Sequence, residues 1–238
     1  MIKVGCCGFG ETQRKYFEEF PVIEIQITFY QPPRLETARG WREKAPENFE
    51  FTLKAWQLIT HEFSSPTYRR LTEKIPQASL ERCGSFKPTR EVLRAWERTE
   101  EIVRVLKSKV IVFQCPASFK PTAENKQNLM SFFQTVSRTD LLFAWEPRGD
   151  WKPEEVRTLC EELNLIHCVD PFKGTATWGK IRYFRLHGVT GYRYQFTDED
   201  LQNLRALCAG PGDVYCLFNN VTMLEDARRF LRLSSELC

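Results

Sequence analysis

An arginine and a histidine stand two residues apart, at Arg185 and His187, within residues 181–188, Ile-Arg-Tyr-Phe-Arg-Leu-His-Gly. Side chains two residues apart in a strand share one face, so Arg185 and His187 point the same way while Phe184 points into an apolar layer. Burying this pair is costly unless carboxylates or a ligand meet it. The face is therefore predicted to be either an anion-binding site or a neutralised ion network, and Gly188 would let a ligand approach the backbone.

Acidic side chains stand at the ends of other strand-like runs. Glu146 and Asp170 are candidates for a general acid and base, because carboxylates crowded in a low-dielectric site have raised or split pKa values. The alternative is that each only neutralises Arg185 or Lys54. Lys54 is itself a candidate to hold a phosphate or polarise a carbonyl, or else to form a salt bridge with Glu24.

Eight short β-rich runs must position these residues, and most are separated by segments of helical periodicity. The runs cover residues 2–7, 22–29, 50–55, 110–115, 141–146, 165–169, 181–187 and 214–218. Eight such repeats in 238 residues match a closed (β/α)8 barrel, which carries active sites at the C-terminal ends of its strands. We predict one TIM-type barrel domain over residues 1–238, with an enlarged loop or lid at 56–87 after the third strand. An open dinucleotide-binding sheet is disfavoured, because residues 5–10 lack the G-x-G-x-x-G spacing.

The period-two pattern also predicts which side chains face the barrel interior, because the outer helices require apolar partners. The second run shows the split best, with Ile23 and Ile25 alternating with polar residues. The side chains assigned to the inward faces are Glu24, Gln26, Thr28, Tyr30, Thr52, Lys54, Trp56, Glu146, Arg148, Cys168, Asp170, Tyr183, Arg185 and His187. Gln114 and Asn219 stand at strand ends, whereas His167 is expected to face the helices. The charged members of this set should converge at the barrel mouth.

Composition gives no sign of a membrane protein or of a strongly basic surface. The chain has 34 basic and 31 acidic residues and a net charge of +3, so any anion site must be local. No apolar run is long enough to span a membrane, and residues 3–11 do not form the hydrophobic stretch of a signal peptide. We therefore expect a soluble, cytoplasmic protein.

The nine cysteines include no C-x-x-C pair, so a structural zinc site is not expected. Most lie in apolar stretches, where cysteine behaves as a small hydrophobe, and the sequence cannot supply the connectivity of any disulfide. Cations compete for the carboxylates of the same mouth, which argues against a catalytic metal. We expect neither a metal nor another cofactor.

Two loops near the predicted mouth indicate the class of ligand. Residues 170–180 combine glycines, hydroxyls, two lysines and a tryptophan, and residues 191–196 interleave aromatic side chains with an arginine. Stacking surfaces beside cations suit bases, sugars or phosphates. A loop that is held in place by its own aromatic side chains has the same composition.

Short motifs follow one another along nearly the whole chain, at residues 5–9, 23–30, 41–51, 59–61, 113–119, 146–151, 183–188 and 215–220, together with Lys54 and Asp170. In this order they resemble the YecE-like family of TIM-barrel proteins, a domain of unknown function. The resemblance implies a TIM-type barrel and carries over as motif positions Glu24, Lys54, His61, Glu146, Arg148, Asp170, Arg185, His187 and Asn219. Gln26 and the Cys6-Cys7 pair depart from the asparagine and the small hydroxyl residues usual in the family, so fine substrate contacts are expected to differ.

The resemblance implies no reaction. The family is compared with xylose-isomerase-like and endonuclease-like barrels, which suggests nucleic-acid binding only by analogy of fold. We predict an enzyme of hydrolase or isomerase type that acts on a small polar, phosphate-bearing molecule or on a nucleic-acid end, with Glu146, Asp170 and His187 as acid/base residues. The residues predicted to contact the substrate are Glu24, Lys54, His61, Arg148, Arg185 and Asn219. The alternative is a non-catalytic nucleic-acid-binding module, whose affinity would fall steeply with salt.

Overall fold

The computed structural model describes residues 1–138 and 140–235 and contains a closed barrel of eight parallel strands in sequence order. The strands are β1 (Ile2–Cys6), β2 (Val22–Ile25), β3 (Glu50–Lys54), β4 (Val110–Gln114), β5 (Leu142–Glu146), β6 (Ile166–Val169), β7 (Arg182–Leu186) and β8 (Val214–Phe218). Strand β1 closes the barrel by pairing with β8 from Ile2↔Val214 to Cys6↔Phe218. The predicted (β/α)8 barrel is confirmed.

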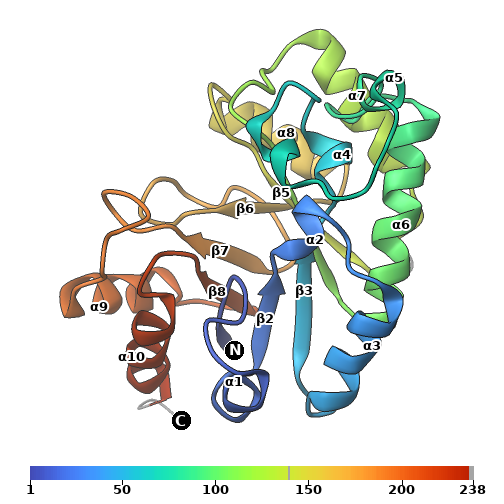
Figure 1. Cartoon of the computed structure of the whole chain (residues 1–238). Helices are drawn as coiled ribbons and strands as arrows, with labels where there is room; N and C mark the ends of the chain where they lie inside the picture. The colour runs from blue at the N-terminus through green and yellow to red at the C-terminus, as the bar shows by residue number, and fades with distance from the viewer. Residues whose placement is uncertain (139, 236–238) are drawn as a thin grey trace.

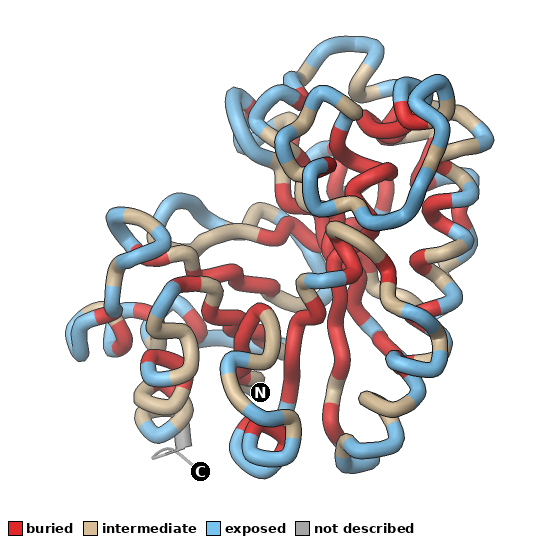
Figure 2. Tube along the Cα trace, in the orientation of Figure 1, coloured by how far each residue is buried: buried red, intermediate tan, exposed pale blue. Residues whose placement is uncertain are grey.

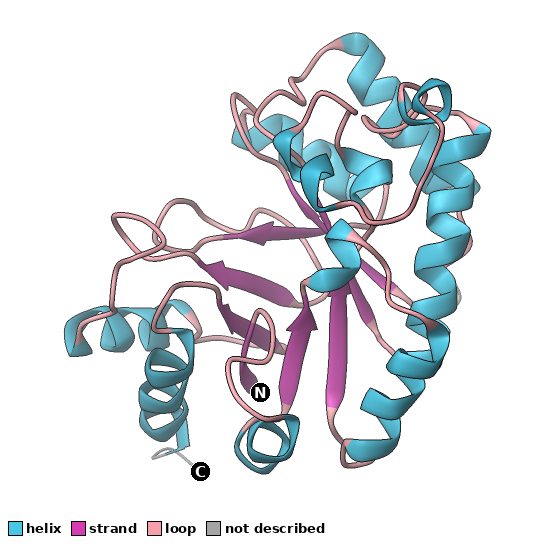
Figure 3. Cartoon of the chain, in the orientation of Figure 1, coloured by secondary structure: helices cyan, strands magenta, loops and turns pink. Residues whose placement is uncertain are grey.

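Helices connect most of the strands and form the outer layer (Figures 1 and 3). They are α1 (Gln13–Glu19), α2 (Ile27–Tyr30), α3 (Leu35–Lys44), α4 (Gln57–Thr60), the 3-10 helix η1 (Pro66–Arg70), α5 (Gln77–Leu80), α6 (Arg90–Leu106), α7 (Ala123–Thr135), α8 (Pro153–Glu162), α9 (Asp198–Leu207) and α10 (Met223–Ser235). Threonine side chains cap α6, α7 and α9 by accepting backbone N–H bonds of the first turn, as Ser/Thr caps commonly do. At α9, Thr197 and Asp200 form a reciprocal cap, in which each side chain accepts the backbone N–H of the other residue. None of the described helices is long and apolar enough to cross a membrane.

Most strands divide their apolar side chains between two clusters, as the period-two pattern requires. The larger cluster lies between the barrel and the helices, and includes Phe184 of β7. The smaller cluster fills the barrel interior and consists of Cys7, Val22, Val110, Val112, Ala144, Ile166, Cys168, Tyr183, Tyr215 and Leu217. Figure 2 shows the strands as the most continuously buried part of the chain. The barrel is thus a packed core with polar residues at both ends, the Lys3–Glu50 pair toward the strand N-terminal ends and Arg185 with its carboxylates toward the C-terminal ends.

The predicted second strand ends earlier than expected, because the chain turns into a short helix. Strand β2 stops at Ile25 and α2 begins at Ile27, whose side chain was expected against the core but is 51% exposed. The Thr28 hydroxyl donates to the carbonyl oxygens of Ile25 (2.8 Å) and Lys54 (2.7 Å), which holds the turn against the end of β3. The inward assignment therefore fails for Thr28 and Tyr30.

The inward assignment is also wrong for Trp56. It stands at the N-terminal cap of α4 and packs in the outer apolar cluster, although the strand pattern placed it inward with Lys54. Its backbone N–H bonds to the Thr99 hydroxyl of α6 (3.4 Å), and its indole N–H bonds to the Tyr30 carbonyl (3.3 Å). The strand has already ended at Lys54, so alternation no longer determines the direction of this side chain.

The enlarged segment predicted after the third strand is built from α4, η1 and α5. It lies beyond the tip of β3, beside the upper part of α6 in Figure 1. Backbone hydrogen bonds fold it onto itself, from Gly84 N–H to Leu58 (2.8 Å) and from Phe86 N–H to Ile59 (2.9 Å). Gly84 has φ +85°, and a Cβ there would lie 2.3 Å from the His61 carbonyl oxygen, so only glycine allows this close packing.

Substitution of Tyr16 tests how β1 and β2 are held together. The Tyr16 hydroxyl accepts a bond from Cys6 N–H (2.7 Å) and donates to the Val22 carbonyl (2.9 Å), so it links β1 and β2 inside the outer core. In Tyr16→Phe both backbone groups lose a buried partner, and we expect the free energy of unfolding in urea to fall by roughly 2–3 kcal/mol. Tyr192→Phe, at a side chain 59% exposed, is the control. Equal stability of the two variants would show that the bridge contributes nothing.

Candidate active site at the barrel mouth

Arg185 lies at the centre of the polar mouth, enclosed by protein. It comes from the inward face of β7, and its residue is 0% exposed. Its Nε lies 3.0 Å from Glu24 Oε2 and its Nη2 lies 3.0 Å from Glu24 Oε1. Its Nη1 donates to Glu146 Oε2 at 2.5 Å. The guanidinium therefore bridges carboxylates of β2 and β5 across the barrel, the arrangement that the sequence left open as a neutralised ion network.

Glu24 is the deeper of the two carboxylates and is fully buried. Besides Arg185 it accepts a hydrogen bond from the Tyr183 hydroxyl (3.0 Å), which also contacts the Thr52 hydroxyl (2.7 Å). The Gln26 amide donates to it as well. Each carboxylate oxygen thus has more than one donor, as a buried charge requires.

Gln26 and the Cys6-Cys7 pair are the two departures from the family resemblance. Each places one side chain in contact with this ion network. Gln26 contacts Glu24, and the Cys7 thiol lies 3.9 Å from Arg185 Nη2. Their side chains therefore line the ion network; neither lines the cavity described below.

Glu146 is held as a carboxylate. Burial alone would raise its pKa, but Arg185 and Arg148 outweigh that effect and lower the pKa to about 2. Arg148 donates to Glu146 Oε1 from Nη2 (2.9 Å) and from Nε (3.2 Å). A group with this pKa is ionised at neutral pH, so it cannot serve as a general acid there and instead positions the two arginines.

Lys54 has no carboxylate partner among the residues that the structure describes. Its Nζ donates to Gln114 Oε1 (2.9 Å) and lies 3.8 Å from the centroid of the Phe29 ring, whereas Glu24 is occupied by Arg185. Burial and the nearby charge of Arg185 lower the Lys54 pKa to about 7. The salt bridge to Glu24, which was the alternative to a ligand-binding role for Lys54, is absent among the described ion pairs, and a substantial fraction of Lys54 is a neutral amine near pH 7.

His187 and Asp170 form a pair at the outer edge of the mouth. Asp170 Oδ2 accepts the His187 backbone N–H (3.1 Å) and lies 3.6 Å from His187 Nδ1. Nε2 of the same ring lies 3.4 Å from Arg148 Nη2 and 3.5 Å from Arg185 Nη1. Guanidinium groups only donate, so in the neutral ring Nε2 is the acceptor and Nδ1 carries the proton, facing the Asp170 carboxylate.

A cavity of about 510 Å³ opens beside this pair. It is lined by Glu146, Pro147, Arg148, Gly149, His167, Cys168, Val169, Asp170, Lys173, His187, Gly191 and Tyr192. The Arg148 side chain is 41% exposed and that of Lys173 is 49% exposed, so both can meet a ligand. The cavity therefore brings a histidine, carboxylates and two accessible cations to the C-terminal ends of β5, β6 and β7, where barrel active sites lie.

Several predicted substrate contacts lie outside the cavity lining. Glu24, Lys54 and Arg185 are buried beneath it. His61 packs on the Phe29 ring (4.8 Å between centroids), and burial with the nearby charge of Lys54 lowers its pKa to about 3, so it is neutral. Asn219 is half-buried; its backbone N–H donates to the Leu186 carbonyl (2.8 Å).

His167 faces outward from the strand, where its Nδ1 accepts from Thr177 N–H (3.2 Å), but it also lines the cavity.

Two residues of the mouth were not assigned a role from the sequence. Gln114 Oε1 accepts from both Lys54 Nζ and Arg185 Nη1 (3.3 Å), and so joins the Lys54 amine to the ion network. Its place at the end of β4 was the available signal. Lys173 lies 3.8 Å from Asp170 Oδ2. It belongs to a loop between β6 and β7, and strand alternation says nothing about the direction of loop side chains.

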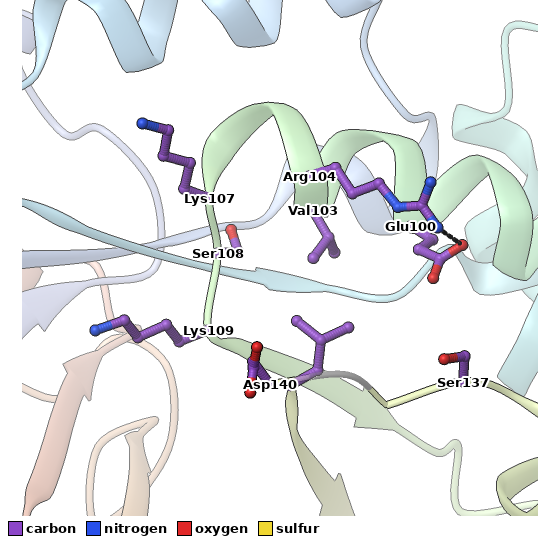
Figure 4. Close-up of a pocket in the computed structure, with 9 residues that line it drawn as sticks. Glu100, Val103, Arg104, Lys107, Ser108, Lys109, Ser137 and Asp140 are labelled. Carbon is purple, nitrogen blue, oxygen red and sulfur yellow. Dashed lines mark ion pairs between the residues drawn. The ribbon is translucent and has the colours of Figure 1, made fainter.

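A second cavity, of about 340 Å³, lies at the opposite end of the barrel, between the end of α6 and the start of β5 (Figure 4). Its cations and anions are mixed, and Arg104 is paired with Glu100 at 3.0 Å. The Lys107 and Lys109 side chains point away from the Arg104–Glu100 pair in Figure 4. Catalytic groups of this fold lie at the other end, so we place the candidate site at the mouth.

Within residues 1–138 and 140–235, no group of three or more His, Cys, Asp or Glu side chains is arranged to hold a metal ion. The mouth carboxylates are paired with cations instead.

Removal of Arg185 tests the ion network. Arg185→Ala leaves Glu24 buried without its main cation, and we expect the free energy of unfolding to fall by roughly 3–5 kcal/mol in urea titrations. Arg193→Ala, at an exposed arginine of the loop 191–196, should leave stability unchanged. A small loss in Arg185→Ala, similar to that of the control, would instead support a direct ligand-binding role for Arg185.

The Lys54 amine predicts a specific pH dependence. Its pKa is about 7 in the fold and about 10.5 unfolded, so between these values the unfolded chain binds more protons and stability rises with pH. We expect the stability of the wild type relative to Lys54→Met to rise by about 1.4 kcal/mol per pH unit between pH 7 and 9. Unfolding both proteins in urea at several pH values measures this difference. Lys173→Met is the exposed control, and a wild-type advantage over Lys54→Met that is constant with pH would show that Lys54 stays charged.

The fold and parts of the sequence are shared with known proteins. Over 73 residues the chain is 30% identical to the UPF0759 protein YunF of Bacillus subtilis, and this stretch covers 25% of the chain and 26% of that protein. A crystal structure of a DUF72 family protein from Enterococcus faecalis aligns with a TM-score of 0.75 at 22% identity, over 99% of this chain and 98% of that one.

More distant structures share only the barrel. A D-psicose 3-epimerase has a TM-score of 0.56 at 13% identity, covering 94% of this chain and 92% of its own. Endonuclease IV from Thermus thermophilus has a TM-score of 0.56 at 12% identity, covering 98% of each chain. The resemblance noted from the motifs is confirmed, because residues 10–237 match the family described as "Protein of unknown function DUF72", and the chain belongs to this family.

Proposed function

We propose that this protein is an enzyme that performs acid/base chemistry on a small polar substrate carrying an anionic group, such as a phosphate, in the mouth cavity. The observation that carries the proposal is the placement of His187 in one cavity with the accessible cations Arg148 and Lys173. A titratable side chain that is oriented by a carboxylate and lies beside cations in one cavity is typical of an active site.

In this proposal His187 is the proton-transferring group. Asp170 holds the proton on Nδ1, which leaves the Nε2 lone pair to accept a proton from the substrate, and it would stabilise the imidazolium that forms. Nε2 faces Arg148 Nη2 at 3.4 Å. A substrate anion that binds Arg148 would compete for this guanidinium and free Nε2 for the reaction.

Arg148 and Lys173 would bind the anionic group. Arginine offers planar paired donors that match phosphate and carboxylate, and lysine offers a point charge. Glu146 takes part in this scheme only as an ionised anchor, since it holds Arg148 at one oxygen and Arg185 at the other. In this proposal Glu146, which the sequence suggested as an acid/base residue together with Asp170, has a positioning role instead.

An activity screen across phosphorylated sugars, phosphoesters and nucleic-acid ends tests the proposal. For a substrate that is turned over, His187→Gln should lower kcat at least about 100-fold, because it removes the proton acceptor. Lys173→Gln should mainly raise KM. Lys180→Gln, at an exposed lysine of the same loop, is the matched control and should change neither constant.

Retained turnover in His187→Gln would remove this residue from the mechanism. Binding of nucleic acid without turnover, with an affinity that falls steeply with salt, would favour the non-catalytic module. That outcome would be consistent with stacking on Tyr192 and Trp178, which are 59% and 37% exposed.

A further inference from the structure

We propose that Cys208 and Cys216 are a redox-active pair that closes to a disulfide when the protein meets a disulfide oxidant. Their sulfur atoms lie 3.5 Å apart in the outer core, away from the mouth cavity. Among the described cysteines this is the one sulfur–sulfur hydrogen bond, and Cys238 lies outside the described residues. Several of the others bond to non-sulfur groups; Cys83, for instance, contacts the Ser79 carbonyl.

The fold holds both residues in place. Cys208 caps α9 through its backbone N–H, which bonds to the Leu204 carbonyl (2.9 Å), and Cys216 lies on the outward face of β8. The Arg182 guanidinium of β7 donates to the carbonyl oxygens of residues 207, 208 and 209 at 2.8–3.0 Å. The end of α9 is therefore fastened to the strand beside β8, and the two sulfur atoms stay adjacent.

The intervening loop can absorb the small movement that closure needs. A disulfide has an S–S distance of about 2.05 Å, so the sulfur atoms must approach by about 1.5 Å. Residues 209–213 contain Gly210 and Gly212 at φ +105° and +88°, conformations that only glycine adopts without strain. A Cβ at Gly210 would meet no atom within 4 Å, so this part of the loop is also sterically free.

Closure by oxidised glutathione balances as two thiol–disulfide exchanges. Cys208, next to the half-exposed Leu207, loses its proton and attacks one sulfur of oxidised glutathione, which releases one reduced glutathione and leaves a mixed disulfide. Cys216 then loses its proton and attacks the Cys208 sulfur, releasing the second reduced glutathione. Two cysteines are oxidised and one glutathione disulfide is reduced, with both protein protons ending on the released thiols.

The bond would fasten α9 covalently to β8. It closes a loop of nine residues, which restricts the unfolded chain more than the folded one. We expect the oxidised protein to melt roughly 5 °C or more above the reduced protein, and the difference to vanish on addition of dithiothreitol.

Peptide mapping of the full chain tests the assignment directly. The protein is unfolded and refolded in buffers with different ratios of reduced to oxidised glutathione, so access to the buried thiols is not limiting. It is then acid-quenched, alkylated while denatured and digested with trypsin. The tryptic peptide 206–228 contains both cysteines and no internal cleavage site. In oxidising buffer we expect this peptide to escape alkylation and to be lighter by two hydrogen atoms than its reduced, unalkylated form.

Variants separate this pair from general thiol oxidation. Cys208→Ala should leave Cys216 alkylatable and abolish the gain in melting temperature, whereas Cys160→Ala, at another buried cysteine, should retain both effects. The proposal is wrong if peptide 206–228 of the wild type takes up two alkyl groups at every glutathione ratio. It is equally wrong if the wild type stops at a glutathione adduct or cross-links other cysteines instead.

Discussion

The barrel interior depends on one buried cation that joins two carboxylates. Arg185 has no exposed surface, and Glu24 and Glu146 approach it from opposite sides. None of these charges could be buried without its partners, because the free-energy cost of removing its hydration would exceed the attraction to any one partner. The three side chains are therefore acceptable only as a set, and the set ties β2, β5 and β7 together above the apolar interior.

This ion network also determines the protonation and the hydrogen-bond partners of the side chains around it. Arg185 occupies Glu24, so Lys54 has Gln114 as its polar partner. Burial and the nearby charge of Arg185 lower the pKa of Lys54, which therefore loses its proton more easily than a free lysine. Glu146 is kept ionised, and its second oxygen holds Arg148 at the edge of the cavity. Arg148 in turn faces the ring nitrogen of His187. The buried charge of Arg185 thus helps, through Glu146, to hold Arg148 and His187 in place, and these are the accessible groups used in the proposed chemistry.

Much of the fold could be predicted from the sequence, because strand alternation is a local property. The inward positions of Glu24, Lys54, Glu146 and Arg185 follow from period two along each strand. Prediction failed where a strand ended early, as at Thr28 and Trp56, since a hydroxyl bond and a helix cap redirect the chain there. It also could not separate buried network residues from cavity-lining ones. That distinction depends on how far each side chain reaches across the barrel and on loop residues such as Lys173.

A double-mutant cycle between Glu24 and Arg185 tests the central claim most directly. Urea unfolding of Glu24→Gln, Arg185→Met and the double variant gives the coupling free energy of the pair. If the arginine neutralises a buried carboxylate, Glu24→Gln should destabilise the wild type but be neutral or stabilising in the Arg185→Met background, with a coupling of about 2 kcal/mol or more. Additive effects, with a coupling below about 0.5 kcal/mol, would contradict the account, because the two charges would then not depend on each other.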